Sequence, residues 1–249
     1  MFDADREQPF ISHLIELRVR LLRIVLGVLL VFAALAPLSN PIYSALAIPL
    51  TRQSTLIAID VLSPFLTPLK FTLILAVFIT IPWTLYQIWA FVAPGLYQRE
   101  KRMVLPILTS STLLFYCGMA FAYFVIMPIF FAFISGTAPQ DVAVMTDINR
   151  YLDFVMMLFF AFGVAFEVPV ATVILSLAGL VSPEAMAAKR SYVIVGAFVI
   201  GMLLMPDVIS QTMLALPMWL LFEAGVFISR LLLRRRAAAR ATASTEESS

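Results

Sequence analysis

The residues of greatest chemical interest in this chain are a few acids inside or beside strongly apolar segments. Glu167 lies near the middle of one such segment, directly before Val168 and Pro169. An ionisable side chain in hydrocarbon costs at least about 2.5 kcal/mol, which makes Glu167 a candidate for proton or ligand binding. Pro169 also leaves the carbonyl of Ala165 without its helical donor. The alternative is a protonated Glu167 that is hydrogen-bonded inside a helix bundle and serves packing alone.

A second acid, Glu16, lies in the amphipathic segment from Ser12 to Arg23. His13, Glu16, Arg20 and Arg23 fall on one side of a helical wheel, opposite a band of leucine and isoleucine. One interpretation is an i,i+4 ion pair between Glu16 and Arg20, worth about 0.3 to 0.5 kcal/mol. The other is a carboxylate presented at the membrane surface to a cationic ligand.

A third acid, Glu100, lies between Arg99 and Lys101, shortly after the turn signal Pro94-Gly95. An isolated acid among basic residues is usually their local counterion. Nothing in the loop itself assigns Glu100 a role beyond that of a counterion.

The residues that other chemistries need are missing. The only histidine, His13, lies outside the apolar runs, and there is neither a His-Glu-x-x-His motif nor a pair of aspartates within a run, which disfavours an intramembrane protease. No Walker-type glycine loop is present, so direct use of ATP is not expected. Cys117 is the only cysteine, which excludes a disulfide scaffold. We therefore expect a protein that is not an enzyme and needs neither cofactor nor metal.

Transmembrane helices must position these acids. The chain is 62% hydrophobic and only 13% charged, with a mean hydropathy of +0.98, which excludes a water-soluble globule. A helix needs about 20 residues to cross about 30 Å of hydrocarbon, and no run shows the alternation of a barrel strand. The predicted fold class is an all-α polytopic membrane protein with six transmembrane helices, and their approximate ranges are 21–38, 69–92, 103–134, 154–177, 192–205 and 212–228.

Basic residues predict the orientation of these helices. With the N-terminus in the cytoplasm, that side receives 14 of the 17 lysines and arginines, so both termini are predicted to be cytoplasmic. Residues 1–236 are predicted to form a single membrane domain, and residues 237–249 a disordered cytoplasmic tail. The net charge of +2 is too small to suggest a nucleic-acid partner. Prolines inside the predicted helices favour kinks, and hence a curved bundle with a concave face, unless they are merely tolerated; they are Pro82, Pro106, Pro128, Pro169 and Pro217.

Five separated motifs resemble the TatC family of the twin-arginine, or Sec-independent, protein translocase. They begin at His13 (HLIELR), Phe91 (FVAPGLYQRE), Phe121 (FAYF), Phe166 (FEVPV) and Val195 (VGAF). The resemblance runs from about Pro9 to Arg230, in the family's order and spacing. It implies a six-helix bundle shaped like a cupped hand in the bacterial cytoplasmic (inner) membrane. It also implies a receptor for Arg-Arg signal peptides of folded precursors, which works with TatA- and TatB-type single-span partners and uses the proton-motive force.

The resemblance also implies roles for individual residues. It assigns signal-peptide binding to Glu16, Glu100 and Phe91, the polar group of the concave face to Glu167, the periplasmic cap to Pro49, Asp60 and Phe65, and partner docking to Met202, Met205 and Gln211. Where relatives often carry a hydroxyl residue and two prolines, this chain has Leu204-Met205-Pro206 before the aspartate, which leaves Gln211 as the main hydrogen-bonding group of the docking surface.

Physical reasoning supports arginine as the ligand, because a carboxylate can hold a guanidinium through two parallel hydrogen bonds. The alternative function is a proton-coupled small-molecule transporter that uses Glu167 as its titrating group. The fifth and sixth spans are short of about 30 Å, so the bilayer should thin around them. Ala197 and Gly201 add a small face on the fifth span that is suited to a partner helix.

Overall fold

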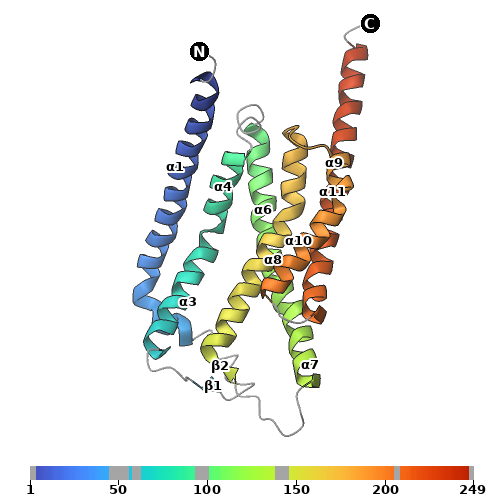
Figure 1. Cartoon of the computed structure of the whole chain (residues 1–249). Helices are drawn as coiled ribbons and strands as arrows, with labels where there is room; N and C mark the ends of the chain where they lie inside the picture. Colours follow the sequence, from blue (N-terminus) through green and yellow to red (C-terminus); the bar gives the residue numbers. More distant parts are fainter. Residues whose placement is uncertain are drawn as a thin grey trace. The chain divides into compact units, whose positions relative to one another are not determined.

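The computed structural model describes residues 4–44, 56–57, 63–92, 101–137, 146–204 and 208–246. The described part of the chain is almost entirely helical (Figure 1), so the all-α fold class is confirmed. Contacts divide the chain into two compact units, each described by itself below. The first comprises Met1–Pro94 and Pro139–Met156, and the second comprises Gly95–Ala138 and Met157–Ser249.

The first unit is built on α1 (Ala4–Leu35), which packs against α3 (Ser63–Ile79) and α4 (Ile81–Val92). The axes of α3 and α4 differ by 52° across the break at Thr80. Pro82 has no N–H to donate to the carbonyl four residues earlier, and the hydroxyl of Thr80 donates to the carbonyl of Ala76 at 2.9 Å. The bend predicted at this proline is therefore present.

Two contacts tie α3 to the start of α8 (Ile148–Leu177) within the first unit. The hydroxyl of Thr67 donates to the side-chain oxygen of Asn149, and Lys70 forms an ion pair with Asp153. Just before α8, the two-residue strand β2 (Thr146–Asp147) pairs in parallel with β1 (Leu56–Ile57). These contacts hold the end of α8 that precedes its long apolar part.

The second unit contains α6 (Lys101–Phe121), a π-helical turn (Ala122–Ile126) and α7 (Met127–Thr137). The π turn lies directly before Pro128, where an α-helix would bring the proline ring against the carbonyl of Phe124. The wider turn is a common solution to that clash.

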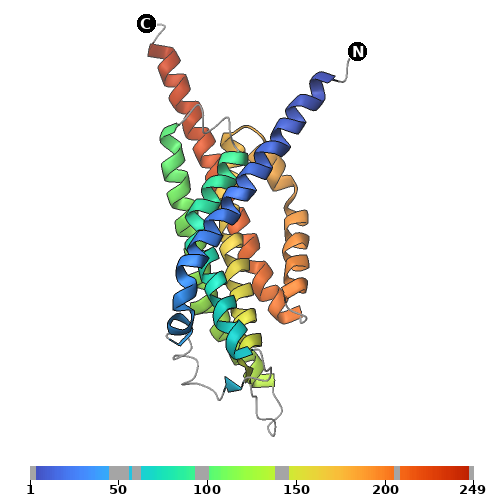
Figure 2. The same cartoon turned by 90° about the vertical axis from the view of Figure 1, so that its left-hand side faces the viewer.

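The remainder of the second unit begins with the apolar part of α8. It continues through α9 (Pro183–Ala188), α10 (Arg190–Leu204) and α11 (Val208–Glu246). The serine at position 182 caps α9, since its hydroxyl accepts from the backbone N–H of Ala185 at 3.2 Å. Figure 2 shows α10 and α11 lying side by side as a hairpin, and the two helices are in contact.

The helices match the predicted spans in place, and most of them are longer. Within the described residues, four helical stretches are long and apolar enough to cross a membrane: His13–Ser44, Leu105–Ala132, Asn149–Leu177 and Gln211–Arg235. The bent pair Phe65–Ile79 and Ile81–Val92 would make a fifth, and the apolar part of α10, Arg190–Met202, is shorter. The count of six spans and the cytoplasmic position of both termini stay predictions.

The last helix runs past the end of the predicted membrane domain. Helix α11 continues to Glu246, and the disordered tail over residues 237–249 stays a prediction. Alanine and arginine are among the strongest helix formers, and a helix that is already nucleated in the last span propagates through them at little cost. The single domain over residues 1–236 stays a prediction.

Candidate functional site

The first candidate site lies near the start of the apolar part of α1, where Glu16 and Arg20 face each other one turn apart. Arg20 donates to Glu16 Oε1 twice, from Nε at 2.9 Å and from Nη2 at 2.5 Å. The Glu16 side chain is 37% exposed and that of Arg20 is 19% exposed. The i,i+4 ion pair considered from the sequence is therefore present, with Arg20 as its less exposed member.

Helix α4 completes this site with a face of three residues at i, i+4 and i+8. Gln87, only 2% exposed, accepts a third hydrogen bond from Arg20, with Nη1 and Oε1 3.4 Å apart. Four residues later, the ring of Phe91 stacks on His13 with centroids 4.2 Å apart. Four residues earlier, the indole of Trp83 donates to the backbone carbonyl of Arg23 at 3.2 Å. The α4 face therefore holds α1 by polar and aromatic contacts at three levels.

Close approach at Trp83 depends on a glycine. A Cβ on Gly27 of α1 would lie 3.0 Å from Cδ1 of the Trp83 ring. The indole can lie against α1 because this position carries no side chain. Sequence reasoning missed Trp83 and Gln87, although their four-residue spacing from Phe91 is the signal that could have revealed them.

The pair leaves part of the carboxylate available. Both guanidinium contacts of Arg20 converge on Oε1, whereas Oε2 lies 4.0 Å from Nδ1 of His13. That separation is longer than a hydrogen bond, and a carboxylate has about four lone-pair sites. As far as the described residues show, Glu16 can therefore accept a further cationic donor through Oε2.

The second candidate site surrounds Glu167 in α8, which is 9% exposed. Its Oε2 accepts a hydrogen bond from the hydroxyl of Ser111 in α6, a residue that is fully buried. A buried carboxyl group gains most from a donor that is itself shielded from solvent. Sequence reasoning found Glu167 but missed Ser111, because nothing local indicated which serine of α6 would face α8.

The packing of α6 against α8 aligns Ser111 with Glu167. Phe115 of α6 fills the space above Gly163 of α8, where an added Cβ would lie 2.6 Å from the ring. Three residues further along α6, Gly118 lies directly against the backbone carbonyl of Phe162. Ser111, Phe115 and Gly118 have the i, i+4, i+7 spacing of a single helix face. The two helices therefore interlock on the face that carries the polar pair.

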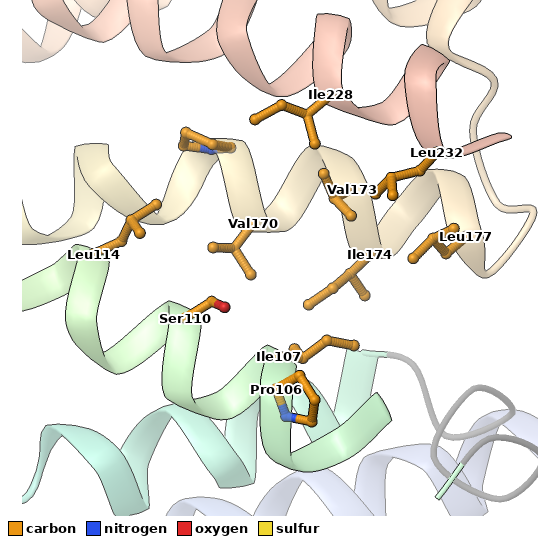
Figure 3. A pocket seen from close by; sticks show the side chains of 11 residues that line it. Pro106, Ile107, Ser110, Leu114, Val170, Val173, Ile174, Leu177, Ile228 and Leu232 are labelled. Atoms are coloured by element: carbon orange, nitrogen blue, oxygen red, sulfur yellow. The ribbon is translucent and has the colours of Figure 1, made fainter. Parts of the chain in front are cut away.

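An apolar groove of about 480 Å³ lies among α6, α8 and α11. Figure 3 shows Ile107 and Ser110 from α6 facing Val170 and Ile174 from α8 across it. Other lining residues include Leu114, Val173, Leu177, Ile228 and Leu232. Ser110 supplies the only side-chain hydroxyl of this lining, so the groove suits hydrocarbon rather than an ion.

Several residues with predicted roles lie outside the described part of the chain: Pro49, Asp60, Glu100 and Met205. The others are spread over separate helices. Phe65 is exposed near the start of α3, Met202 is 70% exposed on α10, and Gln211 is half-buried on α11. Within the described residues, no group of three metal-ligating side chains could hold an ion.

The small face of α10 differs from the expectation. Ala197 and Gly201 were predicted to suit a partner helix, but both are buried, and a Cβ on Gly201 would lie 3.3 Å from the Cα of Gln211. The chain's own α11 therefore uses part of this face. Small residues let two helix backbones approach closely, and here they serve the contact between the arms of the hairpin.

The chain is similar to known proteins over most of its length. The model of the family described as "Sec-independent protein translocase protein (TatC)" matches residues 12–217. The TatC protein of Escherichia coli K12 is 57% identical over 228 residues, which cover 90% of this chain and 88% of that protein. The TatC protein of Haemophilus influenzae is 55% identical over 235 residues, covering 92% of each. The TatC protein of Aquifex aeolicus is 35% identical over 233 residues, covering 92% of this chain and 97% of the relative.

A solved structure agrees with these relatives. The crystal structure of a protein titled twin-arginine translocase receptor TatC superimposes with a TM-score of 0.78 at 37% identity, covering 88% of this chain and 98% of that one. The helical fold, the membrane-length helices and the matches over most of the sequence lead to one conclusion: this chain belongs to the TatC family and is a subunit of the Sec-independent protein translocase, a membrane complex.

Proposed function

We propose that this chain is the subunit that receives Arg-Arg signal peptides of folded precursor proteins. The observation that carries the proposal is Glu16, a partly exposed carboxylate beside α4. It already binds one guanidinium, and among the described residues its second oxygen has no hydrogen-bond donor within reach. A site that accepts the planar fork of Arg20 has the shape and charge that a peptide arginine needs.

Two carboxylates account for a requirement for two arginines. Glu16 receives one guanidinium and Glu100 the other, with Phe91 beside the site. Charge-assisted hydrogen bonds contribute about 1.5 to 3 kcal/mol each, so two contacts supply about 3 to 6 kcal/mol. Micromolar binding needs about 8 kcal/mol. The apolar segment of the signal peptide therefore supplies the difference.

Partners of the TatA and TatB type dock at the surface formed by Met202, Met205 and Gln211. The high exposure of Met202 supports this proposal, since a large apolar side chain on a short span is free for contact with a partner helix. Pro49, Asp60 and Phe65 belong to a periplasmic cap. With these partners, and with both termini in the cytoplasm of a bacterium, the subunit exports folded proteins across the inner membrane by using the proton-motive force.

Charge reversal tests the receptor site. Glu16→Arg and Glu100→Arg should each abolish binding of an Arg-Arg precursor to membranes that contain the complex, while the chain still accumulates as a folded protein. The control is Glu184→Arg, an exposed acid in the first turn of α9 whose reversal should be tolerated. If all three reversals weaken binding equally, general surface charge explains the effect and the two-carboxylate site is wrong.

A second candidate function follows from the burial of Glu167 against Ser111. A buried acid that accepts a hydrogen bond from a hydroxyl can carry a proton in a small-molecule transporter. Purified protein in lipid vesicles distinguishes the two functions. Proton-coupled uptake of a solute by the chain alone would favour the transporter, and dependence on single-span partners and a precursor would favour the receptor.

A further inference from the structure

We propose that Arg20 determines the specificity of the Glu16 site. In the absence of a signal peptide, Arg20 occupies the position of a peptide arginine, and an incoming guanidinium displaces it. The inference rests on the proposed receptor function and adds a competitor to it. The geometry of three side chains carries it, namely Glu16 and Arg20 on α1 and Gln87 on α4.

Arg20 binds Glu16 in an arrangement that is weaker than a paired fork. Its Nε and Nη2 both donate to Oε1, at 2.9 Å and 2.5 Å, instead of spanning the two carboxylate oxygens. A paired fork, in which two parallel N–H groups meet two oxygens, is the stronger arrangement for a guanidinium. A peptide arginine can form that fork with Glu16 only after Arg20 has left Oε1.

Arg20 also has a second acceptor beside it, the side chain of Gln87. Nη1 already donates to Gln87 Oε1 at 3.4 Å, a long contact that can shorten when the guanidinium moves toward α4. Gln87 is almost fully buried, so its carbonyl group has little access to water. The neutral amide is the weaker of the two acceptors, which explains why Arg20 rests on Glu16 when no peptide is bound.

The presence of Arg20 also selects against lysine. A lysine ammonium lacks the planar fork, so it can approach only the available Oε2 as a single point contact. It would then share one carboxylate with Arg20, and the two cations would repel each other. An arginine replaces Arg20 by a group of the same shape. Arg20 therefore makes the site discriminate between the two basic side chains.

The test measures binding of two fluorescent synthetic signal peptides, which carry either Arg-Arg or Lys-Lys, to the purified full chain in nanodiscs. Arg20→Gln should tighten binding of the Arg-Arg peptide by about two- to five-fold, the factor expected when a partly exposed internal ion pair no longer competes. Binding of the Lys-Lys peptide should tighten by a larger factor, so the ratio of the two dissociation constants falls. Arg20→Lys should also tighten binding of both peptides, but by smaller factors than Arg20→Gln.

The matched control is Arg23→Gln, which removes one positive charge from an exposed side chain on the same helix. It should leave the ratio of dissociation constants unchanged.

The inference is overturned if Arg20→Gln weakens binding of the Arg-Arg peptide, because Arg20 would then position Glu16 rather than compete for it. It is also overturned if Arg20→Gln and Arg23→Gln behave alike. Glu16→Gln tests the receptor site separately from the competition by Arg20: if this variant leaves binding unchanged, the receptor site itself is wrong. If it weakens binding while Arg20→Gln fails to tighten it, only the competition is wrong.

Discussion

Gly118 marks the closest approach of α6 to α8, and replacing it tests how Glu167 is positioned. A Cβ at this position would press on the backbone carbonyl of Phe162 and lie 3.0 Å from the ring of Phe166. A side chain can rotate away from such a contact, but a helical carbonyl cannot. Gly118→Ala should therefore push the helices apart and move Ser111, seven residues earlier on the same face, away from Glu167.

A matched glycine supplies the magnitude. Gly196 of α10 has no heavy atom within 4 Å of a Cβ built on it, so Gly196→Ala gains only helix propensity, about 1 kcal/mol. Gly118→Ala gains the same amount and loses about 1 to 3 kcal/mol to overpacking. The propensity gain cancels in the comparison. The free energy of unfolding should therefore be about 1 to 3 kcal/mol lower for Gly118→Ala than for Gly196→Ala, or about 2 to 12 °C in midpoint.

The assay is thermal unfolding of the purified chain in one detergent, followed by circular dichroism at a fixed heating rate. The fixed rate matters because unfolding of such proteins is often irreversible. If Gly118→Ala unfolds at the same temperature as Gly196→Ala, or at a higher one, the close helix contact is wrong. Export of an Arg-Arg precursor should fall in the Gly118 variant and not in the Gly196 variant.

Two further predictions concern the acid and the short span. Glu167→Gln keeps the size of the side chain and one acceptor for the Ser111 hydroxyl, so the complex should assemble and bind precursor. Export should fail only if the acidity of Glu167 matters. Loss of folded protein with both Gln and Ala at this position would favour the packing role. Helix α10 has 15 residues, or about 22 Å, against about 30 Å of hydrocarbon. Four leucines inserted into it should weaken partner docking or export, and unchanged export would contradict a role for bilayer thinning.

The features that the sequence predicted correctly are those governed by local physics. Each membrane-length helix follows from an apolar run, because backbone groups in lipid must be satisfied within the helix itself. The Glu16–Arg20 pair follows from i,i+4 spacing, and the bend at Thr80 follows from Pro82. The family follows from ordered motifs, and the match over residues 12–217 confirms it.

The features that the sequence left open depend on which helix faces meet. Gln87 is 67 positions from Arg20, and Ser111 is 56 positions from Glu167, so no local spacing relates them. The small face of α10 could have served a partner or the same chain, and its contact with α11 decided between them. In lipid, apolar surfaces do not by themselves determine which helices pair, because the lipid tails are equally apolar. Close packing at glycines and a few buried polar contacts determine the pairing, and these exist only once the tertiary structure has formed.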